Sequence, residues 1–357
     1  MNLEDMETYM HRPLTFLTIA LTLASCAAAN KDPVTSNDGP IVEPIKTVFI
    51  DLPDGMMFPE GIAEGSEGSL YVSVFGSNAI LQIDSGGSVN VFKQPGENGL
   101  MGPVGLVADL QRNRLWVASV NGETFMSKLF VFDLNTGATL ATHEGPPAQG
   151  PHFFNEVVLA SDGRVYLTDT LQPRIWTAGP ELTDPLSVVI EDPRLTNPNP
   201  ERPLGLNGFA FTPDGRYLIA SVMDRITQGG GRLLRLDPAS GELDPIEIDG
   251  DIDSFGGSDG MFFEPQNDRL VMVNATPPSS IVSASFNGDF TRATLTDHAY
   301  ADSVANRPSS SALSGERLWI VNSQLDHVID DGNGAVGTPP DLPFQIVGVD
   351  ATATLAP

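Results

Sequence analysis

The chain contains very little cysteine and little positive charge. Cys26 is the single cysteine among 357 residues, which excludes an intramolecular disulfide and a cluster of thiolate metal ligands. Lysine and arginine number 19 against 46 aspartate and glutamate residues, for a formal charge of −27. A surface this negative repels phosphate backbones, so we expect no nucleic-acid partner. The acidic residues are scattered, which favours a solvated surface over a tract that attracts cations.

A helical hydrophobic period of useful length is also missing after the first 45 residues. Short runs of β-branched, aromatic and aliphatic residues take its place, separated by Gly, Asp, Asn and Pro. Hydrophobic residues make up 41% of the chain, which is enough for a sizeable core. The sequence therefore predicts an all-β globular domain.

The beginning of the chain resembles an export signal. The run over residues 13–24, PLTFLTIALTLA, has the length of a signal peptide and is too short to span a bilayer. It leads into Ala24-Ser25-Cys26, which resembles the lipobox of bacterial lipoproteins, in which the cysteine becomes the lipidated N-terminus. The alternative is an accidental cysteine within a discarded peptide. The acidic residues before the run would be absent if translation starts at Met10.

These features set the expected organisation of the first 45 residues. We expect residues 1–25 to be a lipoprotein signal peptide and residues 26–45 to be the lipidated Cys26 and a flexible tether. Lipid attachment explains a lone cysteine in an oxidising compartment. The predicted location is the bacterial cell envelope, in the periplasm or at the outer membrane, with membrane contact through the lipid on Cys26.

Six copies of one pattern occupy the remainder of the chain. Each copy has a polar residue, a small residue, two or three apolar positions, a turn, and a second apolar strand that ends in small polar residues. The first apolar residues of the copies are separated by 44 to 52 positions and are Ile62, Leu106, Val157, Phe209, Met261 and Ala312. This period is typical of propeller blades. We predict that residues 46–357 form a monomeric six-bladed β-propeller, closed by pairing of residues 47–52 with residues 344–349.

Equivalent positions in propeller blades converge on one axis, so the repeat also predicts a site. The position two before each first apolar residue is occupied by Glu60, Val104, Asn155, Asn207, Asp259 and Ser310. Four of the six, Glu60, Asn155, Asn207 and Asp259, offer carboxylate or amide oxygens, which suit a hard divalent cation, with calcium the first choice. The alternative is that these side chains cap strand ends and turns, where Asn and Asp are common.

The same residues resemble the senescence marker protein/gluconolactonase family of six-bladed propellers, and more distantly the paraoxonases. The matching motifs are Pro59-Glu60-Gly61, Asn155-Glu156, the run NGFAFTPDG from Asn207, and Asp259-Gly260-Met261. The resemblance implies that Glu60, Asn207 and Asp259 ligate the metal, that Asn155 is a fourth ligand or a substrate contact, and that Asp259 doubles as general base. Sugar-lactone hydrolases of the family carry an arginine where this chain has Phe153.

The expected activity is metal-dependent hydrolysis of a lactone or similar small ester in the central channel. His152 is a second candidate base if it lies at the channel mouth, and a histidine hydrogen-bonded in a loop otherwise. A membrane-anchored propeller that only binds or scaffolds partners is the rival interpretation, with the ion stiffening the channel. A quinone-dependent sugar dehydrogenase would need a basic cluster over the channel, and few arginines lie near the motifs.

Overall fold

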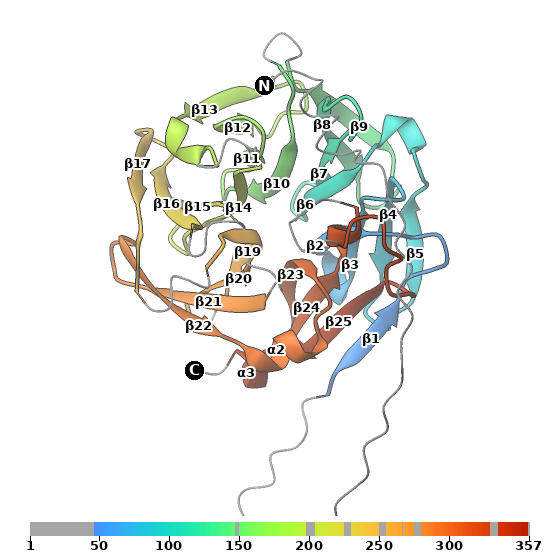
Figure 1. Cartoon of the computed structure of the whole chain (residues 1–357). Coiled ribbons are helices and arrows are strands. Elements are labelled where there is room, and N and C mark those ends of the chain that lie inside the picture. The colour runs from blue at the N-terminus through green and yellow to red at the C-terminus, as the bar shows by residue number, and fades with distance from the viewer. Residues whose placement is uncertain are drawn as a thin grey trace, which may run out of the picture.

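Six sheets are arranged in a ring about one axis in the computed structural model, which confirms the all-β six-bladed propeller (Figure 1). The predicted signal peptide, Cys26 and the tether lie outside the described residues. The structure describes residues 46–146, 150–197, 204–224, 230–249, 255–265, 267–274, 280–328 and 335–355.

Each blade runs from an inner strand at the channel to an outer strand at the rim (Figure 1). From the channel outward, the first three blades are β2 (Pro59–Glu64), β3 (Leu70–Val74), β4 (Ala79–Ile83) and β5 (Val89–Lys93); β6 (Pro103–Asp109), β7 (Arg114–Val120), β8 (Ser127–Asp133) and β9 (Thr139–Glu144); and β10 (Phe154–Leu159), β11 (Val165–Asp169), β12 (Arg174–Ala178) and β13 (Ser187–Glu191).

The last three blades follow the same order. They are β14 (Leu206–Phe211), β15 (Leu218–Val222), β16 (Arg232–Asp237) and β17 (Glu242–Pro245); β19 (Ser258–Phe263), β20 (Leu270–Asn274), β21 (Ser280–Phe286) and β22 (Arg292–Asp297), with β18 (Glu247–Asp249) parallel to β22; and β23 (Pro308–Ser314), β24 (Arg317–Asn322), β25 (Gln345–Asp350) and β1 (Val48–Asp51).

The ring closes by sharing the last blade between the two ends of the domain. Strand β1 is the outermost strand of that blade and pairs antiparallel with β25, with Val48 opposite Gly348 and Asp51 opposite Gln345. The Leu52 N–H continues the pairing by donating to the Phe344 carbonyl at 2.8 Å. The predicted closure is thereby confirmed, and it leaves no open gap between the first and last blades.

The core lies between neighbouring blades, where apolar side chains of the sheets interdigitate. Trp116 on β7 and Trp176 on β12 are at most 2% exposed, and both belong to one cluster that joins the second and third blades. The helices of the described ranges are short, α2 (Ala299–Val304) and α3 (Ala351–Thr354) among them. None of the helices in those ranges is long and apolar enough to cross a membrane.

Candidate metal centre in the central channel

Every inner strand contains a β-bulge at the position where the sequence predicted chemistry. In the first blade, Pro59 pairs with Val74 and Ile62 with Val72, so one extra residue is accommodated around Glu60 and Gly61. The same one-residue shift occurs in the other five inner strands, β6, β10, β14, β19 and β23. A bulge re-aims the side chains at its position. Repetition of this device around the ring directs the bulge residues at the channel.

Glycines beside the bulges let the inner strands approach closely. A Cβ atom on Gly208 would lie 1.9 Å from the Asp259 carbonyl oxygen of the next blade, and one on Gly105 would lie 2.4 Å from the Asn155 carbonyl oxygen. No side chain fits at such distances, so glycine is required by the approach of the neighbouring backbone. Glycine therefore follows the bulge residue in four of the six inner strands, at Gly61, Gly105, Gly208 and Gly260, where it allows neighbouring strands to lie close together.

The four predicted oxygen ligands come together at this level of the channel. Glu60, Asn155, Asn207 and Asp259 are each 3 to 8% exposed and line one pocket, which we call the channel pocket. Its other described lining residues are Phe75, Val104, Phe153, Thr170, Leu204, Met223, Arg307, Pro308, Ser323, Leu325 and Asp326. The repeat thus correctly placed side chains that are up to about 200 residues apart in the sequence.

Hydrogen bonds link three of these side chains in a row. Asn155 Nδ2 donates to Asn207 Oδ1 at 2.8 Å and to the Thr170 hydroxyl at 3.1 Å. Asn207 Nδ2 in turn donates to Asp259 Oδ1 at 2.8 Å and contacts the Met223 sulfur at 3.2 Å. Both amide groups are therefore oriented by their N–H donors. The Asp259 carboxylate is held at one oxygen by a neutral donor.

The carboxylates of the channel carry a strong electrostatic penalty. Burial raises the pKa of Glu60 well above its ordinary value of 4.5, and the charges of Asp259 and Glu156 raise it further. Burial also raises the pKa of Glu156 to about 8, against the lowering effect of the Val157 N–H and with a further increase from Asp259. Like charges that share a buried site favour binding of a proton or a cation.

The donor set fits a hard divalent cation. No hydrogen bond from the described residues reaches the Glu60 carboxylate or the Asn155 Oδ1 atom, although both residues are buried at the channel pocket. Two carboxylates and two amide oxygens match the ligand preference of calcium, with water completing the shell. Within the described ranges, no group of three or more His, Cys, Asp or Glu side chains could hold a metal ion. A divalent cation here would therefore need the amide oxygens of Asn155 and Asn207 in addition to the two carboxylates.

The sixth blade departs from the predicted register by one residue. Pro308 pairs with Asn322 and Ser311 with Ile320, so Ser309 rather than Ser310 is the structural equivalent of Glu60. The Ser309 hydroxyl donates to the Glu60 carbonyl at 2.6 Å and ties the last inner strand to the first. The run Ser309-Ser310-Ser311 has no contrast in polarity, so the sequence pattern could not fix the register there.

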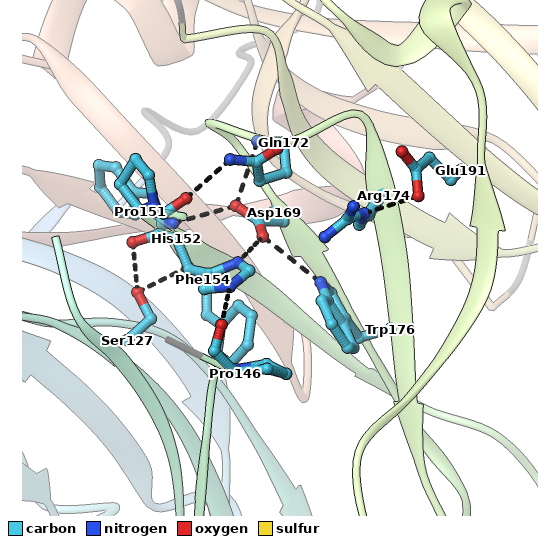
Figure 2. Close-up of polar contacts among 11 residues, drawn as sticks. Ser127, Pro146, Pro151, His152, Phe154, Asp169, Gln172, Arg174, Trp176 and Glu191 are labelled. Carbon is cyan, nitrogen blue, oxygen red and sulfur yellow. Dashed lines mark hydrogen bonds and ion pairs between the residues drawn. The ribbon is translucent and has the colours of Figure 1, made fainter. Parts of the chain in front are cut away.

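His152 is buried beside the channel pocket and is not among its described lining residues. Figure 2 shows its ring between two acceptors, with Nδ1 2.6 Å from Asp169 Oδ2 and Nε2 3.1 Å from the Pro146 carbonyl oxygen. Neither ring nitrogen offers a lone pair to the channel, so the prediction of a base at the channel mouth has no support in this geometry. The loop interpretation of His152 describes the contacts better.

The network around Asp169 instead positions the start of β10. Asp169 Oδ1 accepts the Phe153 N–H at 3.0 Å. Asp169 Oδ2 accepts the Trp176 indole N–H at 3.4 Å (Figure 2). The Ser127 hydroxyl of the second blade donates to the His152 carbonyl at 2.7 Å. These bonds fix the chain immediately before Asn155. His152 therefore helps to position Asn155 and is not itself among the described residues that line the channel pocket.

Several residues of the channel pocket were missed from the sequence. Four of them, Phe75, Thr170, Met223 and Ser323, share one position in the repeat, directly after the second strand of a blade. The predicted repeat was defined by the inner strands, so it did not include these positions. An alignment of the second strand ends would have placed these side chains at the channel as well.

Comparison with known proteins shows where this architecture occurs. No protein-family model matches the chain, and no curated protein matches it significantly. Among solved structures, a gluconolactonase from Xanthomonas campestris has 14% identity and a TM-score of 0.56, covering 86% of this chain and 89% of its own. A calcium-binding regucalcin from Agrobacterium tumefaciens has 16% identity and a TM-score of 0.55, covering 83% and 92%.

A third neighbour carries a different chemistry on a similar fold. The aldose sugar dehydrogenase from Streptomyces coelicolor, solved with bound PQQ, has 17% identity and a TM-score of 0.56, covering 86% of this chain and 99% of its own. At these identities the likeness is one of fold. The resemblance to gluconolactonase and regucalcin-like six-bladed propellers is confirmed at that level.

Proposed function

We propose that the protein is a calcium-dependent hydrolase of a lactone or similar small ester, acting in the channel pocket. The single observation that carries the proposal is the convergence of Glu60, Asn155, Asn207 and Asp259 from four blades on one buried pocket. The gluconolactonase and regucalcin neighbours support it, since they share the fold at low identity. The site chemistry, not the fold alone, gives the reaction class.

Glu60, Asn207, Asp259 and Asn155 would hold the cation. When bound, calcium would supply Lewis-acid polarisation of the substrate carbonyl. Asp259 serves as general base: its carboxylate takes a proton from the water that attacks the carbonyl carbon, and the acyl–oxygen bond breaks as the proton passes to the leaving alkoxide. The hydrogen bond from Asn207 Nδ2 to Asp259 Oδ1 holds this carboxylate in place during the transfer.

The apolar part of the pocket selects the non-reacting part of the substrate. Phe75, Phe153 and Leu204 line it together with Val104. Apolar walls exclude water around the reacting groups and strengthen electrostatic interactions there. A compact ester or lactone with some hydrocarbon surface suits this lining.

The test combines turnover with calcium binding. Purified protein is assayed against a panel of aliphatic and aryl lactones with added calcium, and calcium affinity is measured by calorimetry. Asp259→Asn is expected to lower kcat/KM by about 100- to 10,000-fold. Glu60→Gln should weaken calcium binding by about 100-fold, since a buried ligand charge is removed. Asp54→Asn, at an exposed loop position, is the matched control and should change neither quantity.

The outcomes separate the hydrolase from the rival binding module. Calcium-dependent thermal stabilisation that Glu60→Gln abolishes, without turnover of any ester, would assign the ion a structural role. Absence of calcium binding by the wild-type chain would refute the metal centre itself. Turnover that survives Asp259→Asn would remove Asp259 from the reaction.

A further inference from the structure

Arg307 is the one cationic side chain among the described residues that line the channel pocket. It directly precedes β23 and lies far in sequence from the motifs that identify the metal centre. Its backbone is in the left-handed region, with φ of 51°. This conformation is uncommon for arginine and persists only where surrounding contacts impose it.

Those contacts come from the end of the neighbouring strand β24. The Ser323 hydroxyl donates to the Arg307 carbonyl at 2.7 Å, and the Gln324 N–H donates to the same oxygen at 3.2 Å. Gln324 itself is left-handed, with φ of 49°. The left-handed conformations of Arg307 and Gln324 thus fix the point from which the Arg307 side chain enters the pocket.

The guanidinium is anchored on one side. Arg307 Nε lies 3.2 Å from Asp326 Oδ2, and the Asp326 side chain is 6% exposed. Arg307 Nη1 is buried and has no hydrogen-bond partner among the described residues. A buried N–H without an acceptor is costly, and such groups in folded proteins call for a ligand or water. No described residue supplies this acceptor, which a ligand that enters the channel pocket would provide.

We infer that Arg307 determines specificity by binding a carboxylate substituent on the substrate. This inference rests on the proposed function and deepens it: the substrate is a lactone or ester that also carries a carboxylate. The ester carbonyl would lie at the metal centre, and the carboxylate would accept from the Arg307 guanidinium, which lines the same pocket. A planar guanidinium forms strong, directional bonds with carboxylates, and Asp326 holds it in orientation.

The charges of the pocket are consistent with this assignment. The two ligand carboxylates, Glu60 and Asp259, are balanced by a divalent cation, and Asp326 is balanced by Arg307. The charges of the described lining residues then sum to zero, and a carboxylate enters next to the Arg307 guanidinium. Without the cation, the same carboxylate meets Glu60 and Asp259 uncompensated. Recognition of the anionic substrate should therefore depend on calcium.

The activity test uses one pair of lactones that differ in a single group. The pair is 5-oxotetrahydrofuran-2-carboxylate and its neutral primary amide. With calcium, the wild-type protein should prefer the carboxylate by about 10- to 100-fold in kcat/KM, the value of one charge-assisted hydrogen bond. Arg307→Gln should remove the preference chiefly through KM. Arg164→Gln, at a surface arginine paired with exposed Asp162, is the matched control.

A binding test decides the assignment even if neither lactone is hydrolysed. Glutarate has a second carboxylate that butyrate lacks, so calorimetry of both, with calcium and with chelator, isolates the contribution of Arg307. The wild-type chain should bind glutarate about 10- to 100-fold more tightly than butyrate, and Arg307→Gln should bind both equally. Failure of hydrolysis alone then refutes the proposed function and leaves the Arg307 assignment to this comparison.

Arg307→Gln removes the ion pair with Asp326, so the double variant Arg307→Gln/Asp326→Asn serves as a second test. Thermal melting reports whether each variant is folded. The double variant should lose the glutarate preference and keep calcium affinity close to that of the wild type. Absence of a glutarate preference in the wild-type chain, or its survival in both Arg307 variants, would overturn the inference.

Discussion

Replacing Glu156 by glutamine is expected to remove much of the pH dependence of stability between pH 5 and pH 8. Burial is the main reason that the pKa of Glu156 is raised to about 8 from its ordinary value of 4.5, and Asp259 adds to the increase. Between these two pH values the folded protein keeps a proton that the unfolded chain has released. Stability therefore falls as pH rises through this window and is greatest below pH 4.5 with respect to this group.

The magnitude follows from the shift itself. A rise from 4.5 to about 8 corresponds to about 5 kcal/mol of stability lost between those pH values, at about 1.4 kcal/mol per pH unit. At about 2 °C per kcal/mol, this is a decrease in Tm of about 10 °C. Glu60 acts in the same direction, because the pKa of its carboxyl is also raised. A residual slope should therefore remain after Glu156→Gln.

The assay is thermal unfolding in chelator at half-unit steps from pH 4.5 to 8.5. The wild-type Tm should fall with pH, and Glu156→Gln should flatten the curve and exceed the wild-type Tm at pH 8. Glu123→Gln, at an exposed turn, is the control and should parallel the wild type. Identical slopes for the wild type and Glu156→Gln would refute the claim that burial of this carboxyl costs stability. Calcium should raise the wild-type Tm by a larger amount as pH rises, because protons compete with the ion for the carboxylates.

Two further predictions concern the inner strands and the beginning of the chain. Gly208→Ala should destabilise the fold by about 3 kcal/mol and weaken calcium binding, because the new Cβ would lie 1.9 Å from the Asp259 carbonyl oxygen; Gly288→Ala, in open space, is the control for chemical denaturation. An unchanged Tm in Gly208→Ala would show that the strands can separate without cost. Cys26→Ser should move the expressed full-length chain from the detergent phase to the aqueous phase in a phase-partition assay, since the sequence predicts lipid attachment at that residue. Equal partition of both chains would rule out the lipid anchor.

The sequence repeat was sufficient to predict most of the fold. Strand periodicity and turn residues are local properties, so the six inner strands and the pairing of β1 with β25 could be predicted from the pattern alone. The repeat also brought Glu60, Asn155, Asn207 and Asp259 to one pocket, because equivalent positions in a closed ring are related by rotation about a common axis. The convergence of these positions does not depend on how far apart the residues lie in the sequence.

The environment of the side chains could not be predicted in the same way. His152 is three residues from Asn155, yet its ring turns to Asp169 and Pro146 because the second and third blades pack around it. Ser309 takes the place predicted for Ser310 because three consecutive serines give no contrast in polarity from which the register could be read. The orientation of His152 depends on contacts between blades, which a repeat pattern in one sequence does not encode.

The sequence by itself determined the number of blades, the inner strands and the set of candidate oxygen ligands, since spacing, polarity and turn chemistry repeat along the chain. Tertiary structure alone decided the pKa values of Glu60 and Glu156 and the entry of Arg307 into the channel pocket. The physical reason is that burial and charge proximity arise from distances in space. Those distances exist only once six separately encoded blades have closed around one axis.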